Sequence, residues 1–501
     1  MIGSPSRAKQ NRRSSGVRGL ALAEVATVSS LFVMAVFFAR PLLEEWGFFA
    51  AFRSSGATTY WNLIPRFSLR PLVGIPLVLE WLIARGSSWG VGVGFGLLLM
   101  AKYGALRWAV NGFVSRRAAW VIATLGTVLV PWTGEWTLRN SGSDLAPVFL
   151  YLALGASLRY ADRRQARWFL LCATSIALTL ATHESLTCCD LLIPVLAVLR
   201  PARQPAKMSL ARRGVIASAP VALGLGLYGV YALIAKATMG SGYEGDLAGT
   251  GSPVRHPVSA VIDGTPDIYR TLYAHSPWTI LILAAIMFCL VGHLFDEVPT
   301  RRLRQLWIGG AAAALGLLPL LALPYAVNPI FLVDPDRVGF PLAVGFVLLV
   351  TGLMLRFSDD AARSIAYPGV VVAVLLGTLA QAHSTSLDYN LENEVITATQ
   401  NEAAQFGTRS VVVQDYSGRL GDVLTLYETT LRAALAARGS NVAAQICTPL
   451  GVDRINPYAQ ILEVPTTLRC NELGPLPAHT LLLNVVEVPG GGVTIEPAGT
   501  T

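Results

Sequence analysis

The chain has 501 residues, of which 53% are hydrophobic and 14% are charged. A typical globular protein is about 25% charged, and one membrane anchor could not produce a mean hydropathy of +0.51. The apolar excess lies in blocks of roughly 15 to 22 residues, long enough to cross a hydrocarbon core of about 30 Å. This composition excludes disordered, fibrous, disulfide-scaffold and cytosolic proteins, and it predicts a polytopic membrane protein.

The charge distribution favours a membrane role over a nucleic-acid partner. The formal charge is +8 and the pI is near 9.3, but the sequence has no basic surface interleaved with aromatic residues. Basic residues instead mark cytoplasmic loops. The basic tail, residues 1–18, precedes an apolar run over 19–39 that lacks a signal-peptide cleavage site. We therefore expect an uncleaved first span with the N-terminus in the cytoplasm.

Clusters of Lys and Arg recur between the apolar blocks and set their orientation. If every cluster is cytoplasmic, residues 19–382 form an all-α bundle of about eleven transmembrane helices, and the C-terminus lies outside. The predicted spans are 19–39, 89–112, 118–132, 145–158, 167–182, 187–200, 214–235, 278–295, 306–326, 338–355 and 365–382. The prolines and charges of 71–84 favour an interfacial helix on the outer face, and a hydrophobic hairpin with 89–103 is the alternative. The main outer loops are then 40–88 and 236–277.

Residues 383–501 have the composition of a soluble domain. Short apolar runs bounded by turn residues predict strands, and one periodic segment predicts a helix. The strands are Ser410–Gln414, Val442–Ile446 and Thr480–Val485, and the helix is Asp422–Arg438. We expect a small extracytoplasmic α/β domain. Its two cysteines, Cys447 and Cys470, lie on the oxidising side, which favours a disulfide over two free thiols.

An acidic pair stands at the outer boundary of the first span. Glu44 and Glu45 follow this span beside Trp46, Phe48 and Phe49. Partial desolvation raises the proton affinity of a carboxylate, so a glutamate here could act as a general base. A solvated loop charge beside an interfacial aromatic belt is the alternative interpretation.

Other charged side chains share this predicted outer side. Arg66 and Arg70 lie in the first outer loop, and arginine suits a lipid phosphate because it stays charged and binds bidentately; an interfacial anchor is the alternative. The others are Glu135, Arg139, Asp144, His183, Glu184 and Arg337. A transporter would place more ionisable groups near the midplane, where Lys102 and Asp190 are the main candidates. The clustering favours a reaction of a phosphate-bearing lipid.

The order of these motifs, over residues 20–345, resembles the GT-C membrane glycosyltransferases. The resemblance is to protein O-mannosyltransferases and to bacterial enzymes that use polyprenyl-phosphate sugars. It rests on Glu44-Glu45 where aspartate is usual, the aromatic-Arg-Pro-Leu step of Phe67–Leu72, the short loop from Glu135-Trp136 to Asp144-Leu145, Thr182–Ser185 with His183 in place of a lysine, and Arg337 before Phe340-Pro341.

This resemblance implies transfer of a sugar from a polyprenyl-phosphate donor to an acceptor glycan, lipid or protein on the outer face, with inversion at the anomeric carbon. Glu45, with Glu44 as helper, would deprotonate the acceptor. The implied donor-phosphate ligands are Arg70, Arg337, His183 and Arg66, and the implied supporting residues are Glu184, Glu135, Arg139 and Asp144. Some relatives also hold a divalent metal ion near the acidic pair. The composition suggests a bacterial inner membrane.

Three other functions stay open at this point. An O-antigen-type polymerase or ligase also uses outer arginines and histidine on lipid-linked glycans, but an acidic pair directly after the first span is not its hallmark. A transporter or lipid-glycan flippase is disfavoured because the sequence shows no convincing internal repeat. The last is a non-catalytic assembly or sensor protein with an outer α/β domain.

Overall fold

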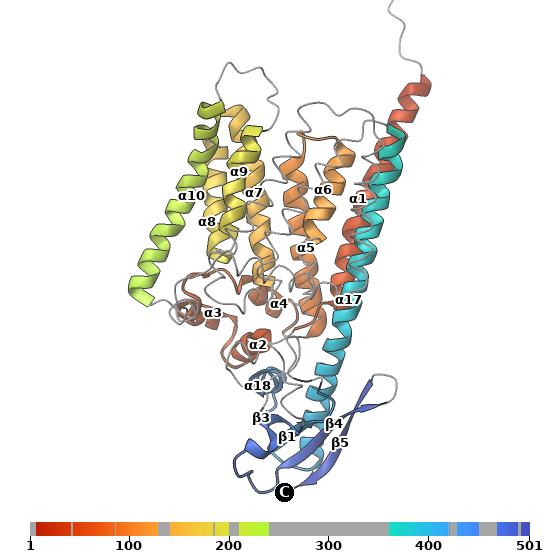
Figure 1. Ribbon diagram of the computed structural model, residues 1–501, viewed down its shortest axis with the longest axis vertical. Coiled ribbons are helices and arrows are strands. Elements are labelled where there is room, and N and C mark those ends of the chain that lie inside the picture. Colours follow the sequence, from red (N-terminus) through yellow and green to blue (C-terminus); the bar gives the residue numbers. More distant parts are fainter. Residues whose placement is uncertain are drawn as a thin grey trace, which may run out of the picture.

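The computed structural model describes most of the helical bundle and the C-terminal sheet. The described residues are 7–41, 44–85, 87–128, 141–183, 186–199, 210–239, 360–418, 420, 428–449, 468–488 and 492–500. Long helices stand side by side in the upper part of Figure 1, and a five-stranded sheet lies below them. Predicted spans 278–295, 306–326 and 338–355 lie outside the described residues.

Each of the other predicted spans coincides with a helix of the bundle. The bundle helices are α1 (Arg7–Phe38), α5 (Ser88–Val110), α6 (Arg116–Val128), α7 (Ser141–Arg163), α8 (Ala166–Thr182), α9 (Thr187–Leu199), α10 (Leu210–Met239) and α17 (Asp360–Gln405). Among the described residues, three segments are long and apolar enough to cross a membrane, namely Arg18–Phe38, Trp89–Val110 and Arg212–Met239. Ala166–Thr182 and Tyr367–Leu379 are shorter apolar helices. The described residues therefore support a mostly helical membrane protein.

Glycines bring several bundle helices into close contact. A Cβ built on Gly92 of α5 would lie 2.7 Å from the Cα of Val36 in α1. A Cβ on Gly224 of α10 would lie 2.6 Å from the carbonyl oxygen of Ala173 in α8. Transmembrane helices associate through small residues of this kind, because lipid supplies no hydrophobic drive between them. The sequence thus sets two helix crossings at positions where only glycine fits.

Short helices cover the lower end of the bundle, where α1 and α8 end in Figure 1. They are α2 (Glu44–Ser55), η1 (Ala57–Thr59), α3 (Tyr60–Leu63), η2 (Ile64–Phe67) and α4 (Ile75–Ala84). Helix α4 has 10 residues, which span about 15 Å, half of a hydrocarbon core. It packs against α5 and α7. Glu80 of α4 is buried, at 1% exposure, because this side of the helix packs against Gly94 of α5.

The C-terminal sheet is largely parallel. Its elements are β1 (Ser410–Asp415), α18 (Glu428–Ala437), β2 (Ala443–Thr448), β3 (Leu468–Arg469), η7 (Cys470–Glu472), β4 (Leu481–Val488) and β5 (Gly492–Thr500). The strand order is β3-β2-β1-β4-β5, and only the β4–β5 pair is antiparallel. The three strands expected from the sequence are confirmed, whereas the helix begins at Glu428, and residues 421–427 lie outside the described part. Cys447 and Cys470 form a disulfide.

Helix α17 joins the bundle to the sheet without a break. Its 46 residues span about 69 Å, and the change of composition at 382/383 falls inside it. The upper part runs beside α1 and α6, and the lower part packs against β1 and β4 (Figure 1). One buried apolar cluster extends along this path, from Met34 and Leu99 in the bundle to Val413 in β1.

Candidate functional site

The charged groups expected to act together lie at the lower end of the bundle. Glu45 lies in the first turn of α2, Arg70 lies between η2 and α4, and His183 follows the end of α8. The described basic clusters lie at the other end, where α6 begins at Arg116 and α7 ends at Arg163 (Figure 1). The fold therefore separates the candidate site from the basic loops, as the charge pattern predicted.

Two tyrosines of α10 hold the loop that carries Arg70. The hydroxyl of Tyr231 donates to the carbonyl oxygen of Ser68 at 2.8 Å. The hydroxyl of Tyr228 donates to that of Leu69 at 3.0 Å. Backbone carbonyl groups in a buried loop need such donors, so this part of the loop is fixed to a helix some 160 residues further along the chain.

The other side of the loop is fixed by Tyr60 and by α8. The Tyr60 hydroxyl donates to the carbonyl oxygen of Pro71 at 2.5 Å and accepts from the N–H of Gly74 at 3.1 Å. Burial raises the pKa of Tyr60 to about 12, so the hydroxyl keeps its proton. The N–H of Leu72 donates to the carbonyl oxygen of Ala181 in the last turn of α8, at 3.1 Å. Arg70 thus projects from a backbone that is held at both sides.

This contact brings the Arg70 loop to the end of α8 that carries His183. Ala181 is two residues before His183 in the chain. His183 is 5% exposed, and its backbone N–H donates to the carbonyl oxygen of Thr179 at 2.8 Å. Its φ of −157° ends the helix there. An arginine and a histidine from distant parts of the sequence therefore lie on adjoining backbone segments.

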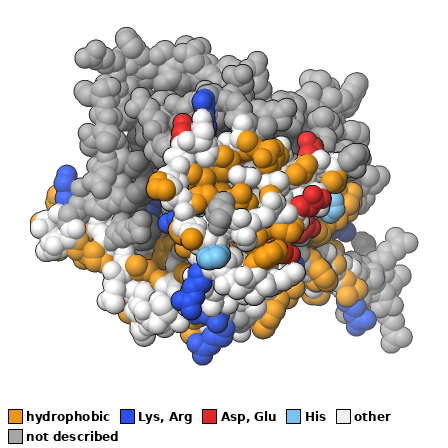
Figure 2. Space-filling view, turned by 90° about the horizontal axis from the view of Figure 1, so that it is seen from below, with side chains coloured by type: hydrophobic (Ala, Val, Ile, Leu, Met, Phe, Trp, Pro, Cys, Tyr) orange, Lys and Arg blue, Asp and Glu red, His pale blue; other side chains and the backbone are white. Residues whose placement is uncertain are grey.

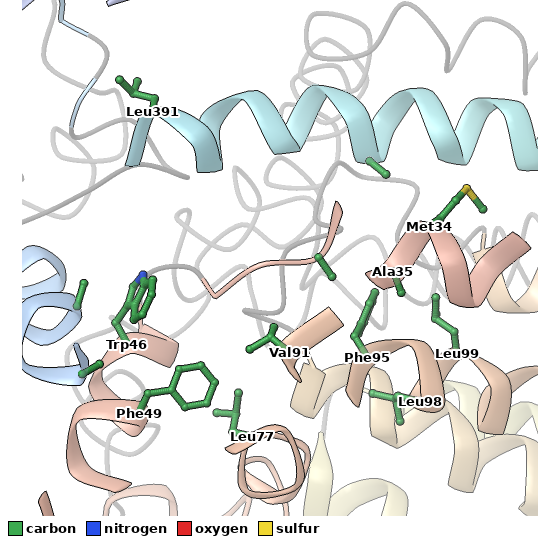
Figure 3. Packing of buried hydrophobic residues seen from close by; sticks show 14 of the residues in the cluster. Met34, Ala35, Trp46, Phe49, Leu77, Val91, Phe95, Leu98, Leu99 and Leu391 are labelled. Carbon is green, nitrogen blue, oxygen red and sulfur yellow. The ribbon is translucent and has the colours of Figure 1, made fainter. Parts of the chain in front are cut away.

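Glu45 lies in the first turn of α2 and is 2% exposed. The same helix buries Trp46 and Phe49. The Phe49 ring stacks on Trp81 of α4, with ring centroids 6.0 Å apart and an interplanar angle of 28°. Figure 3 shows Phe49 pointing towards Leu77 of α4, with Trp46 beside it. A buried carboxyl group beside aromatic rings is the environment expected for a general base.

Asp144 makes an ion pair inside the bundle. It lies in the first turn of α7, and an oxygen of its carboxylate accepts from Nζ of Lys102 in α5 at 2.5 Å. The side chains are 7% and 0% exposed. The hydropathy pattern predicts Lys102 near the midplane and Asp144 in an outer loop. The structure joins these two residues, because a charge buried in the bundle requires a partner.

Glu80 is a further candidate, which the motifs of the sequence do not indicate. Neither oxygen of its carboxyl group has a hydrogen-bond partner among the described residues. Burial raises the pKa of Glu80 well above its usual value, so the group favours its neutral form. A Cβ on Gly94 of α5 would lie 2.4 Å from its Cγ. The signal that could have found it is the run Gly90, Gly92, Gly94 and Gly96, which leaves room on α5 for a neighbouring side chain.

Several predicted site residues lie outside the described part of the chain. These are Glu135, Arg139, Glu184 and Arg337, together with residues 240–277 of the long outer loop and the side chains of Glu44 and Arg66. Within the described residues, no group of His, Cys, Asp and Glu could hold a metal ion. Seen from below, the described surface at this end of the molecule mixes apolar patches with uncharged polar side chains and backbone, and charged side chains lie towards its edges (Figure 2).

Comparison with known proteins gives a structural match. No protein-family model matches the chain, and no curated protein matches its sequence. The crystal structure of ArnT from Cupriavidus metallidurans in the apo state is similar, with a TM-score of 0.52 and 11% identity over 94% of this chain and 93% of that one. The same enzyme bound to undecaprenyl phosphate gives a TM-score of 0.50 and 10% identity over 93% of each chain.

At this level of identity the similarity shows the fold. It extends over nearly the whole of both chains, so it includes the bundle and the C-terminal part. The match therefore shows that the chain has a fold like that of ArnT.

Proposed function

We propose that the protein is a membrane glycosyltransferase that uses a polyprenyl-phosphate sugar and acts at the lower end of its bundle, on the outer face of a bacterial inner membrane. The observation that carries this proposal is the fixed loop of Arg70, joined by Leu72 to the end of α8 beside His183. ArnT, which has a similar fold, was crystallised with undecaprenyl phosphate. The basic clusters at the opposite end suit the cytoplasmic side.

In this proposal the arginine acts on the phosphate of the donor. Negative charge develops on the phosphate oxygen as its bond to the sugar breaks. A guanidinium group can bind two of these oxygens and stays charged. Because the backbone on both sides of Arg70 is already held, little reorganisation is needed during the reaction, which is the condition for strong electrostatic stabilisation. His183, Arg337 and Arg66 would contribute to the same phosphate site.

Glu45 takes the role of the general base, with Glu44 as helper. The acceptor hydroxyl gives its proton to the Glu45 carboxylate, and its oxygen attacks the anomeric carbon. The bond from that carbon to the phosphate oxygen breaks, and the lipid phosphate leaves with the electron pair. This single displacement inverts the anomeric centre. Glu135, Arg139 and Glu184 would support the site, and Asp144 would do so through its pair with Lys102.

The experiment is donor cleavage by the purified protein in nanodiscs. A panel of polyprenyl-phosphate sugars is supplied with envelope glycan and lipid acceptors, and release of free polyprenyl phosphate is followed. We expect Glu45→Gln to lower the rate by about 100- to 10,000-fold. Arg70→Ala should raise the KM for the donor and also lower the rate. The exposed residues Glu487→Gln and Arg409→Ala serve as matched controls.

The outcomes separate the alternatives. Wild-type turnover in Glu45→Gln would refute the assignment of the base. An O-antigen-type polymerase would tolerate alanine at both Glu44 and Glu45. Movement of a lipid-linked glycan across the bilayer without donor cleavage would instead identify a transporter. Measuring the rate before and after addition of EDTA tests whether this protein requires a metal ion, as some relatives do.

A further inference from the structure

The C-terminal α/β domain contacts the helix that carries Glu45. Helix α2 lies between the bundle and α18 (Figure 1), and it packs on α18. Phe49 and Phe52 face the bundle side, where both rings contact Trp81 of α4, with centroids 6.0 and 6.1 Å away. The start of α2 therefore has one neighbour in the membrane part and another in the sheet domain.

Arg438, directly after α18, makes the contact at the start of α2. Its guanidinium carbon lies 5.6 Å from the centre of the Trp46 ring, within the range of a cation–π interaction. The same guanidinium donates to Oδ1 of Asn393 at 2.6 Å and to Oγ1 of Thr397 at 3.0 Å, both on α17. These two hydrogen bonds fix the orientation of the guanidinium group that contacts Trp46.

A second contact holds the far end of α2. Nη1 of Arg53 donates to the carbonyl oxygen of Ala437 at 3.2 Å, at the C-terminus of α18. This is the end of a helix dipole that favours a cation. The guanidinium fits against Gly439, where a Cβ would lie 2.6 Å from Nη2. Gly439 has a φ of +83°, so both the space and the backbone favour glycine there.

The two contacts fix α2 in direction and in rotation. A short helix held at one end could still rotate about its axis, whereas contacts at both ends and on two faces prevent this. Trp46 is 3% exposed and follows Glu45 directly. Because successive helical residues share one rigid backbone, a shift of the α2 backbone at Trp46 displaces Glu45 as well.

We infer that the α/β domain is a positioning element of the reaction site, and that Arg438 is a positioning residue that sets the place of Glu45 through Trp46. The inference rests on the proposed function for the role of Glu45. A displacement of about 1 Å at a reacting group can lower a rate by about 100-fold. The domain therefore contributes to turnover even though its own side chains need not touch the donor.

The test compares Arg438→Ala with Arg432→Ala. Arg432 lies within α18 and donates to the carbonyl oxygen of Ala444 in β2, so its loss perturbs the domain but leaves the contact between Arg438 and Trp46 in place. We expect Arg438→Ala to lower kcat by about 10- to 100-fold with little change in KM, and to shift the pH profile of kcat/KM on its Glu45 limb. Arg432→Ala should change thermal stability alone. Arg438→Lys should restore part of kcat, because an ammonium group also interacts with an aromatic ring.

A second measurement keeps the inference testable if no donor is cleaved. Hydrogen exchange of the backbone amides over residues 45–52 reports how firmly α2 is held. Arg438→Ala should accelerate this exchange about tenfold relative to Arg432→Ala. If the wild type lacks turnover but Arg438→Ala still exchanges faster than Arg432→Ala, the proposed function is wrong and the positioning contact is supported. If both variants match wild type in kcat, pH profile and exchange, the inference is wrong.

Discussion

The ion pair of Lys102 and Asp144 gives the sharpest test of the bundle. Lys102→Met keeps the length and the apolar stem of the side chain but removes the ammonium group. Asp144 is then left as a carboxylate that is 7% exposed in the middle of packed helices. Removing one partner of a buried pair costs about 3–5 kcal/mol, because the remaining charge is uncompensated. We expect Lys102→Met to lower the free energy of unfolding by that amount.

The matched control is the double variant Lys102→Met with Asp144→Leu. Replacing the whole pair by hydrophobic residues of similar volume is often nearly neutral, so the double variant should recover most of the lost stability. The assay is thermal unfolding in detergent at pH 7, followed by loss of monodisperse protein. The reasoning is refuted if Lys102→Met melts with wild type, or if the double variant is no more stable than Lys102→Met.

Three further perturbations test other parts of the structure. Burial raises the pKa of Glu392 to about 8, although Trp46 and Arg438 act to lower it. Between pH 4.5 and 8 the folded state therefore holds a proton that the unfolded state has lost. The free energy of unfolding of the wild type should fall by about 1.4 kcal/mol for each unit by which the pH rises through this range. Glu392→Gln should remove this slope in melts across that range. Gly92→Ala should cost about 1–3 kcal/mol by overpacking against α1, whereas Gly104→Ala, with open space around it in the same helix, should be neutral or stabilising; equal melting points would contradict the crossing. Cys447→Ser should destabilise the sheet domain by about 3 kcal/mol, from a loop of 23 residues, and a reductant should have the same effect on wild type alone.

The sequence was informative wherever a local pattern decides the structure. Hydropathy blocks predicted the helices, and short β-branched runs such as Ser410–Gln414 predicted strands within two or three residues of their ends. These features depend on neighbours in the chain, so a single sequence carries them. The acidic pair and the Arg-Pro step were selected because their residue types suit proton transfer and phosphate binding. Their placement at one end followed from the charge rule for loops.

Contacts between distant residues could not be predicted in this way. Nothing in the sequence near Ser68 indicates that Tyr231 will hold its carbonyl group, because a tyrosine in an apolar helix has many possible acceptors. The pair Lys102–Asp144 required two charges from different helices, at positions that hydropathy alone assigned to different depths. The sequence predicts a boundary at 382/383, but helix α17 continues through it. Hydropathy reports the surroundings of a helix, whereas the helical backbone continues whether lipid or water surrounds it.

The position of α2 connects these observations. A general base for sugar transfer must stay at one distance from the anomeric carbon while a long lipid donor enters and leaves. A carboxylate on a loop at the membrane surface would not satisfy this condition. Helix α2 buries aromatic rings on both of its faces, against α4 in the membrane part and beside α18 in the sheet domain. Because each buried aromatic side chain contributes about 1.5–3 kcal/mol, separating the domain from the bundle would be costly. A rigid sheet domain at the end of a 46-residue helix therefore makes physical sense as a support for the site.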